Sequence, residues 1–168
     1  MFYTSTRNKN IKVTAAQAIA QGISEEGGLF VPCELPQFSL DKIASMVDMP
    51  YTQRAKTVLK DFLTDFSEEE LDYCVNGAYA AEKFSSSKIA PTVNVAGNKN
   101  ILELWHGPTC AFKDMALQLL PYLMTVSAKK TADGKTIVIL VATSGDTGKA
   151  ALEGFKDVDH TRILVFYP

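Results

Sequence analysis

An α/β fold with a parallel sheet, preceded by a mostly helical segment, is what this sequence predicts. Residues 136–142 and 162–166 are continuous runs rich in Ile, Val and Leu, and a helical pattern at 147–155 separates them. Such runs are typical of parallel strands that are covered on both faces. Residues 1–85 instead carry apolar side chains at helical spacing. We therefore expect a helical segment over 1–85 and the first part of an α/β domain over 86–168.

The helical segment should begin with a short helix that is capped by Thr14 and runs through Ala20. A Gly-Gly break then precedes a strand at 29–31. The motif Ser67-Glu68-Glu69-Glu70 is a capping box, in which the serine oxygen accepts the Glu70 amide and the Glu70 carboxylate reaches back. Helices are expected at 39–49, at 52–66 and from 68 to about 79. No catalytic constellation lies on them.

After a serine-rich hinge at 85–87, strands and helices alternate. Two strands, at 92–95 and 101–105, should flank an Asn-Lys-Asn turn. A helix from Met115 to about Lys130 should be kinked by Pro121, which removes a backbone donor. The β-α-β unit then follows.

Composition excludes several functions. The chain has 168 residues, 46% of them hydrophobic, which suffices for one core. A net charge of −2 offers no basic surface for nucleic acid or an anionic membrane. Three cysteines without CxxC spacing and two histidines make a structural metal site unexpected. With no secretory signal and no apolar run of membrane-spanning length, we expect a soluble cytoplasmic protein.

The segment His106–Asp114 carries the first candidate site. It sets Lys113 beside Phe112 at the expected start of a helix, after a Gly-Pro turn. The positive end of a helix disfavours a second positive charge, which favours a free, nucleophilic amine. The phenylalanine ring can lie against a planar heteroaromatic ring. The alternative is an ordinary solvated lysine near a helix start.

The segment Thr143–Gly148 carries the second candidate site, between a buried strand and a helix. Its backbone amides and the hydroxyls of Ser144 and Thr147 can bind a carboxylate or phosphate. The alternative is a generic turn with Asp146 or Thr147 as the helix cap. A nucleotide-binding P-loop is excluded because Ala150 replaces the required Ser or Thr, and the dinucleotide glycine spacing also fails.

Together, a nucleophilic amine, a flat ring and an anion site suggest pyridoxal phosphate (PLP) chemistry. The combination closely resembles the threonine synthase family, which belongs to the tryptophan-synthase-β-like PLP enzymes. The matching segments are Leu104-Trp105-His106-Gly107-Pro108-Thr109, Ala111-Phe112-Lys113-Asp114 and Ala142-Thr143-Ser144-Gly145-Asp146-Thr147-Gly148, with Ser5-Thr6-Arg7 and Gly27-Gly28-Leu29-Phe30-Val31-Pro32 near the start. The resemblance covers essentially the whole chain.

The resemblance implies a role for each site residue. Lys113 would hold the cofactor covalently and later move protons on the substrate, while Phe112 would flank the cofactor ring and Asp114 would steady the turn. Asp146 is a further expected cofactor contact. The expected substrate-binding residues are Thr143, Ser144, Gly145 and Thr147. His106 and Thr109 would either approach the substrate phosphate or shape the turn.

The implied reaction converts O-phospho-L-homoserine and water into L-threonine and phosphate, a carbon–oxygen lyase reaction on a small amino-acid phosphate. Two alternatives remain: a related phospho-lyase that releases phosphate without completing threonine, and a non-catalytic α/β binding module. Family members are longer and bind the cofactor phosphate through a glycine-rich loop further downstream. We therefore expect the chain to be part of a longer protein and to be inactive alone. No oligomeric state is predicted.

Overall fold

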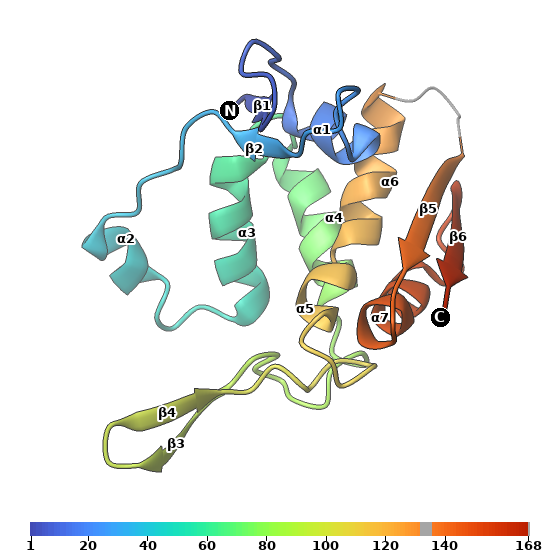
Figure 1. The fold of residues 1–168 in the computed structure, drawn as a ribbon. Coiled ribbons are helices and arrows are strands. Elements are labelled where there is room, and N and C mark those ends of the chain that lie inside the picture. Colours follow the sequence, from blue (N-terminus) through green and yellow to red (C-terminus); the bar gives the residue numbers. More distant parts are fainter. Residues whose placement is uncertain (132–135, 168) are drawn as a thin grey trace. The chain divides into compact units, whose positions relative to one another are not determined.

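The computed structural model describes residues 1–131 and 136–167 (Figure 1). These residues form two compact units. The first comprises Met1–Cys74 with Leu123–Lys135, and the second comprises Val75–Tyr122 with Thr136–Pro168. The division of the chain into domains near residue 85 stays a prediction. None of the helices in the described ranges is long and apolar enough to cross a membrane.

The first unit begins with strand β1 (Tyr3–Ser5), which pairs antiparallel with β2 (Phe30–Pro32). Helix α1 (Ala15–Gln21) lies between them in the sequence. Thr14 caps α1 as predicted, because its Oγ1 accepts the Gln17 amide at 3.3 Å and the Gln17 side chain accepts the Thr14 amide at 2.9 Å. The predicted strand at 29–31 lies one residue further along the chain.

Two hydrogen bonds tie the N-terminal elements to the end of helix α3 (Tyr51–Phe62) and the loop that follows it. The Tyr3 hydroxyl donates to the Phe62 carbonyl at 3.0 Å, and the Ala16 amide donates to Asp65 Oδ2 at 2.9 Å. Burial, with a smaller contribution from the Asp65 charge, raises the pKa of Tyr3. The tyrosine therefore remains a neutral donor in this bond.

Helices α2 (Leu40–Ser45) and α4 (Glu68–Ala78) complete the predicted helical series. The capping box before α4 is present: Ser67 Oγ accepts the Glu70 amide at 3.2 Å, and Glu70 Oε2 accepts the Ser67 amide at 2.7 Å. The helices predicted at 39–49 and 52–66 both end about one turn earlier than expected. The apolar side of α2 is exposed, with Leu40 at 83%.

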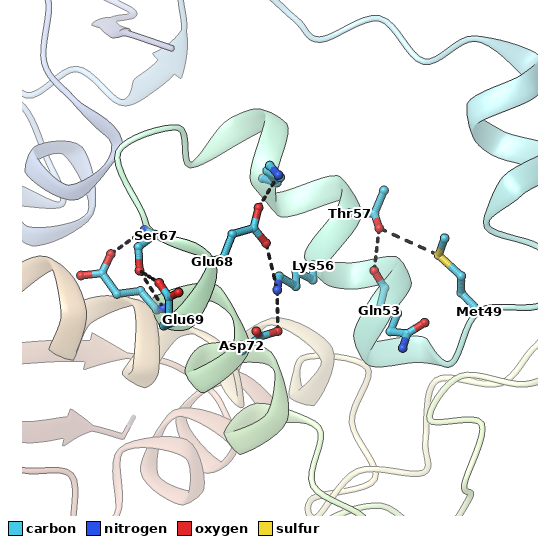
Figure 2. A network of polar contacts seen from close by, with 10 residues as sticks. Met49, Gln53, Lys56, Thr57, Ser67, Glu68, Glu69 and Asp72 are labelled. Carbon is cyan, nitrogen blue, oxygen red and sulfur yellow. Dashed lines mark hydrogen bonds and ion pairs between the residues drawn. The ribbon is translucent and has the colours of Figure 1, made fainter.

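Four charged side chains join α3 to α4 (Figure 2). Lys56 Nζ lies 2.9 Å from Glu68 Oε2 and 2.7 Å from Asp72 Oδ1, and Lys60 also pairs with Glu68. The hydrogen bond from Lys60, followed by that from Lys56, lowers the pKa of Glu68 to about 2. The same network raises the pKa of Lys56, with Asp72 as the larger cause.

The second unit contains an antiparallel hairpin of β3 (Thr92–Ala96) and β4 (Lys99–Leu102), with Val93 opposite Ile101. The second strand, predicted at 101–105, is present but begins two residues earlier and ends at Leu102. The chain turns earlier, at Gly97, whose φ of +54° favours glycine. Every residue of both strands is exposed.

The predicted β-α-β unit is present. Strands β5 (Ile137–Ala142) and β6 (Thr161–Phe166) pair in parallel (Figure 1). Helix α7 (Asp146–Phe155) connects them in the sequence. The expectation that both faces are covered is wrong for the described residues. Burial alternates along both strands, and the register places exposed Leu140 beside exposed Leu164. One apolar face is thus open.

Between the hairpin and β5 lie α5 (Asp114–Leu117) and α6 (Leu120–Thr131). The predicted single kinked helix is therefore two helices. Pro121 lies in the first turn of α6, where its missing amide has no helical acceptor. Within the second unit α7 packs against α5, and a Cβ on Gly154 would overlap the Leu117 carbonyl oxygen. Only glycine permits this approach.

The lowered pKa of Glu68 predicts an acid-sensitive part of the stability. A carboxyl that titrates at about 2 in the folded chain instead of 4.5 stabilises fully above pH 4.5, and this stabilisation disappears as the pH falls toward 2. In urea unfolding of the full-length protein, Glu68→Gln should be less stable than wild type at about pH 6 and should differ less at about pH 3. Glu153→Gln, outside the network, is the control. A constant difference across this range would contradict the network's role.

Candidate functional site

A buried carboxylate holds the turn that precedes Lys113. The side chain of Asp114 is 0% exposed. Its Oδ2 accepts the Thr109 amide at 2.8 Å, and its Oδ1 accepts the Thr109 hydroxyl at 2.7 Å. A charge that is removed from water needs such partners. Because both donors belong to Thr109, their two hydrogen bonds fix the conformation of the turn. These two bonds hold Thr109 within the turn.

The backbone of this turn is tight. The Cys110 amide donates to the Gly107 carbonyl at 3.1 Å, and Cys110 adopts a φ of 59°, in the left-handed region. A Cβ on Gly107 would lie 2.6 Å from Asp114 Oδ2. Glycine at 107 is therefore required for the carboxylate to approach the turn.

The sequence predicted Lys113 in the first turn of a helix. In the structure Lys113 is instead the N-cap of the short helix α5. Helix α5 has only 4 residues, so its dipole is a weak influence on the amine. Lys113 Nζ instead lies 4.4 Å from the centroid of the Phe112 ring, whose quadrupole attracts an ammonium group. Phe112 is 60% exposed, whereas Lys113 is half-buried.

The second candidate loop runs from the end of β5 into α7. The Thr143 amide donates to the Phe166 carbonyl at 3.2 Å, which joins the loop to β6. The N-cap of α7 is Gly145, and no side chain caps the helix. The alternative of an ordinary turn capped by Asp146 or Thr147 is therefore not what the structure shows. Ser144 and Asp146 are exposed, and Thr147 is half-buried.

Gly148 lets this loop fold back closely. A Cβ at this position would overlap the methyl group of Thr143 and lie 3.0 Å from a Val165 methyl. The Gly145 amide also donates to Thr143 Oγ1 at 3.4 Å. The hydroxyl of Thr143 is thus engaged within the loop, whereas Ser144 presents its hydroxyl to solvent.

Both loops belong to the second compact unit, and the contact between α5 and α7 connects the elements that carry them. Phe112, Lys113, Asp114 and Thr109 are brought together in one turn, while residues 143–147 form the other loop. Among the residues that the structure describes, no hydrogen bond or ion pair links one loop to the other.

Sequence reasoning missed two polar residues around His106. His106 Nε2 lies 2.7 Å from Glu103 Oε2, and His106 Nδ1 lies 2.9 Å from Ser85 Oγ. The i, i+3 spacing of Glu103 and His106 is a weak local signal for their contact. Ser85 precedes His106 by 21 residues and carries no such signal.

The side chains suit the aldehyde end of PLP better than a metal ion. Lys113 supplies a primary amine, and no ion pair holds it among the described residues. Phe112 supplies an exposed ring, and the Thr143–Gly148 loop supplies hydroxyls and helix-end amides. In the same described ranges, no group of His, Cys, Asp or Glu could hold a metal.

Burial raises the pKa of Cys74 to about 12, so this thiol is unreactive.

The hydrogen bonds between Thr109 and Asp114 should stabilise the fold measurably. Thr109→Val keeps the shape but removes the hydroxyl donor, and we expect the free energy of unfolding to fall by about 1.5–3 kcal/mol, as for hydrogen bonds to charged groups. Thr109→Ser retains the donor and is the matched control. In urea unfolding, the double variant with Asp114→Asn should lose less than the sum of the single losses. Strict additivity would show that the pair does not act together.

Comparisons with known proteins identify the family that this chain resembles. A family model described as "Threonine synthase N terminus" matches residues 2–79. Threonine synthase from Pseudomonas aeruginosa is 39% identical over 170 residues, which cover 100% of this chain and 35% of that protein. Human threonine synthase-like 1 is 38% identical over 161 residues, which cover 91% of this chain and 21% of that protein.

Solved structures show the same relation. PLP-bound threonine synthase from Brucella melitensis matches with a TM-score of 0.90 and 36% identity, over 100% of this chain and 36% of that one. Threonine synthase from Escherichia coli matches with a TM-score of 0.86 and 35% identity, over 100% of this chain and 37% of that one. The chain thus spans about a third of the length of these threonine synthases and about a fifth of human threonine synthase-like 1. By sequence and by fold, it belongs to the threonine synthase family and corresponds to the N-terminal region of its members.

Proposed function

We propose that the full-length protein is a cytoplasmic, PLP-dependent threonine synthase that converts O-phospho-L-homoserine and water into L-threonine and phosphate. The observation that carries the proposal is Lys113. Its amine lies on an exposed aromatic ring, in a turn held by a buried carboxylate, in a chain similar to threonine synthases over its full length. Reductive trapping of the cofactor, described below, tests it.

When bound, PLP supplies an electron-accepting ring that stabilises negative charge on the substrate carbons. Lys113 holds the cofactor covalently through its amine. An amine at this position would also be able to take a proton from one substrate carbon and return it to another. Phe112 would pack against the cofactor ring and shield it from water.

Asp114 and Thr109 act on the reaction through position. The Asp114 side chain is fully buried and engaged with Thr109, so its part is to fix the direction in which Lys113 leaves the turn. Proton transfer requires the base within hydrogen-bond reach of the reacting carbon, and small displacements lower the rate strongly. His106 shapes the same turn from its other side.

The loop Thr143–Thr147 binds the substrate carboxylate. The uncapped N-terminus of α7 offers amide donors, and the Ser144 and Thr147 hydroxyls add two more. Thr143 and Gly145 shape the loop through their mutual hydrogen bond. Asp146, which is exposed in the first turn of α7, contacts the cofactor from this side.

A second candidate is a threonine-synthase-like phospho-lyase. The observation that favours it is the 38% identity to human threonine synthase-like 1, which is nearly that of the bacterial threonine synthase. The two activities share the first half of the reaction and differ in whether water adds to the substrate. Phosphate release from O-phospho-L-homoserine without an equal amount of threonine would establish the phospho-lyase.

Lys113 should be the residue that carries the cofactor. Borohydride reduction of the full-length protein with PLP, followed by peptide mass mapping, should place a pyridoxyl group on Lys113. Lys113→Ala should lack this label and lose activity by at least about 10²-fold, the smallest usual contribution of a general base. Lys156→Ala, on the exposed end of α7, is the matched control. A label on another lysine, or none, would refute the assignment and favour a non-catalytic module.

Ser144 and Thr147 should contribute to substrate affinity. Each removed hydroxyl takes away one hydrogen bond to a charged carboxylate, and a loss of about 1.5–3 kcal/mol corresponds to a KM higher by roughly 10- to 150-fold. Steady-state kinetics of Ser144→Ala and Thr147→Ala with O-phospho-L-homoserine would measure this. Ser45→Ala, a surface hydroxyl in the first unit, should leave KM unchanged. If both loop variants keep the wild-type KM, the loop does not bind substrate.

A further inference from the structure

Ser85, His106 and Glu103 form a connected relay in the second unit. Ser85 Oγ lies 2.9 Å from His106 Nδ1, and Glu103 Oε2 lies 2.7 Å from His106 Nε2. All three residues belong to the continuous stretch Val75–Tyr122 of this unit. Neither the proposed reaction nor the comparisons assign a role to Ser85 or Glu103.

The direction of each hydrogen bond follows from the chemistry of its partners. A carboxylate only accepts, so the proton between His106 and Glu103 belongs to Nε2. In the neutral imidazole, Nδ1 is then unprotonated and accepts the hydroxyl proton of Ser85. This arrangement is that of a hydroxyl nucleophile with a base and a carboxylate that orients the base, with the two ring nitrogens exchanged relative to the usual order.

The surroundings hold the base and expose the nucleophile. The side chains of His106 and Glu103 are only 16% and 21% exposed, whereas Ser85 is exposed. The Trp105 ring stacks on the imidazole with centroids 5.8 Å apart. The Ser85 amide donates to the His106 carbonyl at 2.9 Å, which fixes the serine backbone against the histidine. The stretch that the sequence suggested as a hinge is therefore tied down at Ser85.

We propose that Ser85 is an activated nucleophile and a site of acylation by activated esters, which goes beyond the threonine synthase activity and does not rest on it. Ser85 Oγ forms a bond to the acyl carbon while its proton passes to His106 Nδ1. The ester C–O bond breaks, and the departing phenolate takes that proton and leaves as the phenol. Glu103 stabilises the imidazolium that forms between the two proton transfers.

The test uses the full-length protein and p-nitrophenyl acetate. Release of p-nitrophenol should show a burst of about one equivalent per chain, and peptide mass mapping should find the acetyl group on Ser85. Ser85→Ala should abolish the burst. Ser87→Ala removes a neighbouring exposed hydroxyl and is the matched control, with the burst retained.

Glu103→Gln distinguishes a relay from a purely structural contact. The variant keeps the size of the side chain but cannot stabilise an imidazolium, so the burst should slow by at least about tenfold while urea unfolding stays close to wild type. Acetyl groups found only on lysines, or equal burst rates in the wild type and in a folded Glu103→Gln variant, would overturn the proposal.

Discussion

The buried carboxylate of Asp114 is the constraint on which the lysine turn depends. A charge that is 0% exposed is tolerated only with well-aligned donors, and Thr109 supplies both of them. To bring Thr109 to this position, the chain turns at Gly107, where the absence of a side chain leaves space for the Asp114 carboxylate. The turn also requires the left-handed backbone conformation of Cys110. This closure places exposed Phe112 next to half-buried Lys113. The lysine is thus carried by a turn whose anchoring carboxylate is fully buried.

The position of the Thr143–Gly148 loop depends on a close backbone contact between α7 and α5. Gly154 of α7 approaches the Leu117 carbonyl of α5 so closely that no side chain fits between them. Because α7 begins at the loop and α5 begins beside Lys113, the packing of these two helices relates an amine to a set of hydroxyl and amide donors. This pairing is where we propose that the cofactor and the substrate bind.

Local signals predicted local structure well. The caps at Thr14 and Ser67 depend on neighbours three residues away, and the apolar runs of β5 and β6 were long enough to indicate a parallel pair. The ends of helices were predicted less accurately, because tertiary contacts decide where a helix ends. The site residues came from a family resemblance, and their roles stay predictions. The contact of Ser85 with His106 joins segments far apart in the chain, and no pattern within one sequence reveals it.

The contact between Gly154 and Leu117 also bears on when the lysine turn acquires its shape during synthesis. Helix α5 leaves the ribosome before β5 and α7 exist, and a helix of 4 residues has little stability of its own. Its partner surface appears only after α7 has been made and has docked. The lysine turn is therefore among the last parts of its unit to become ordered, and a nascent chain carries Lys113 before its supporting helix has formed.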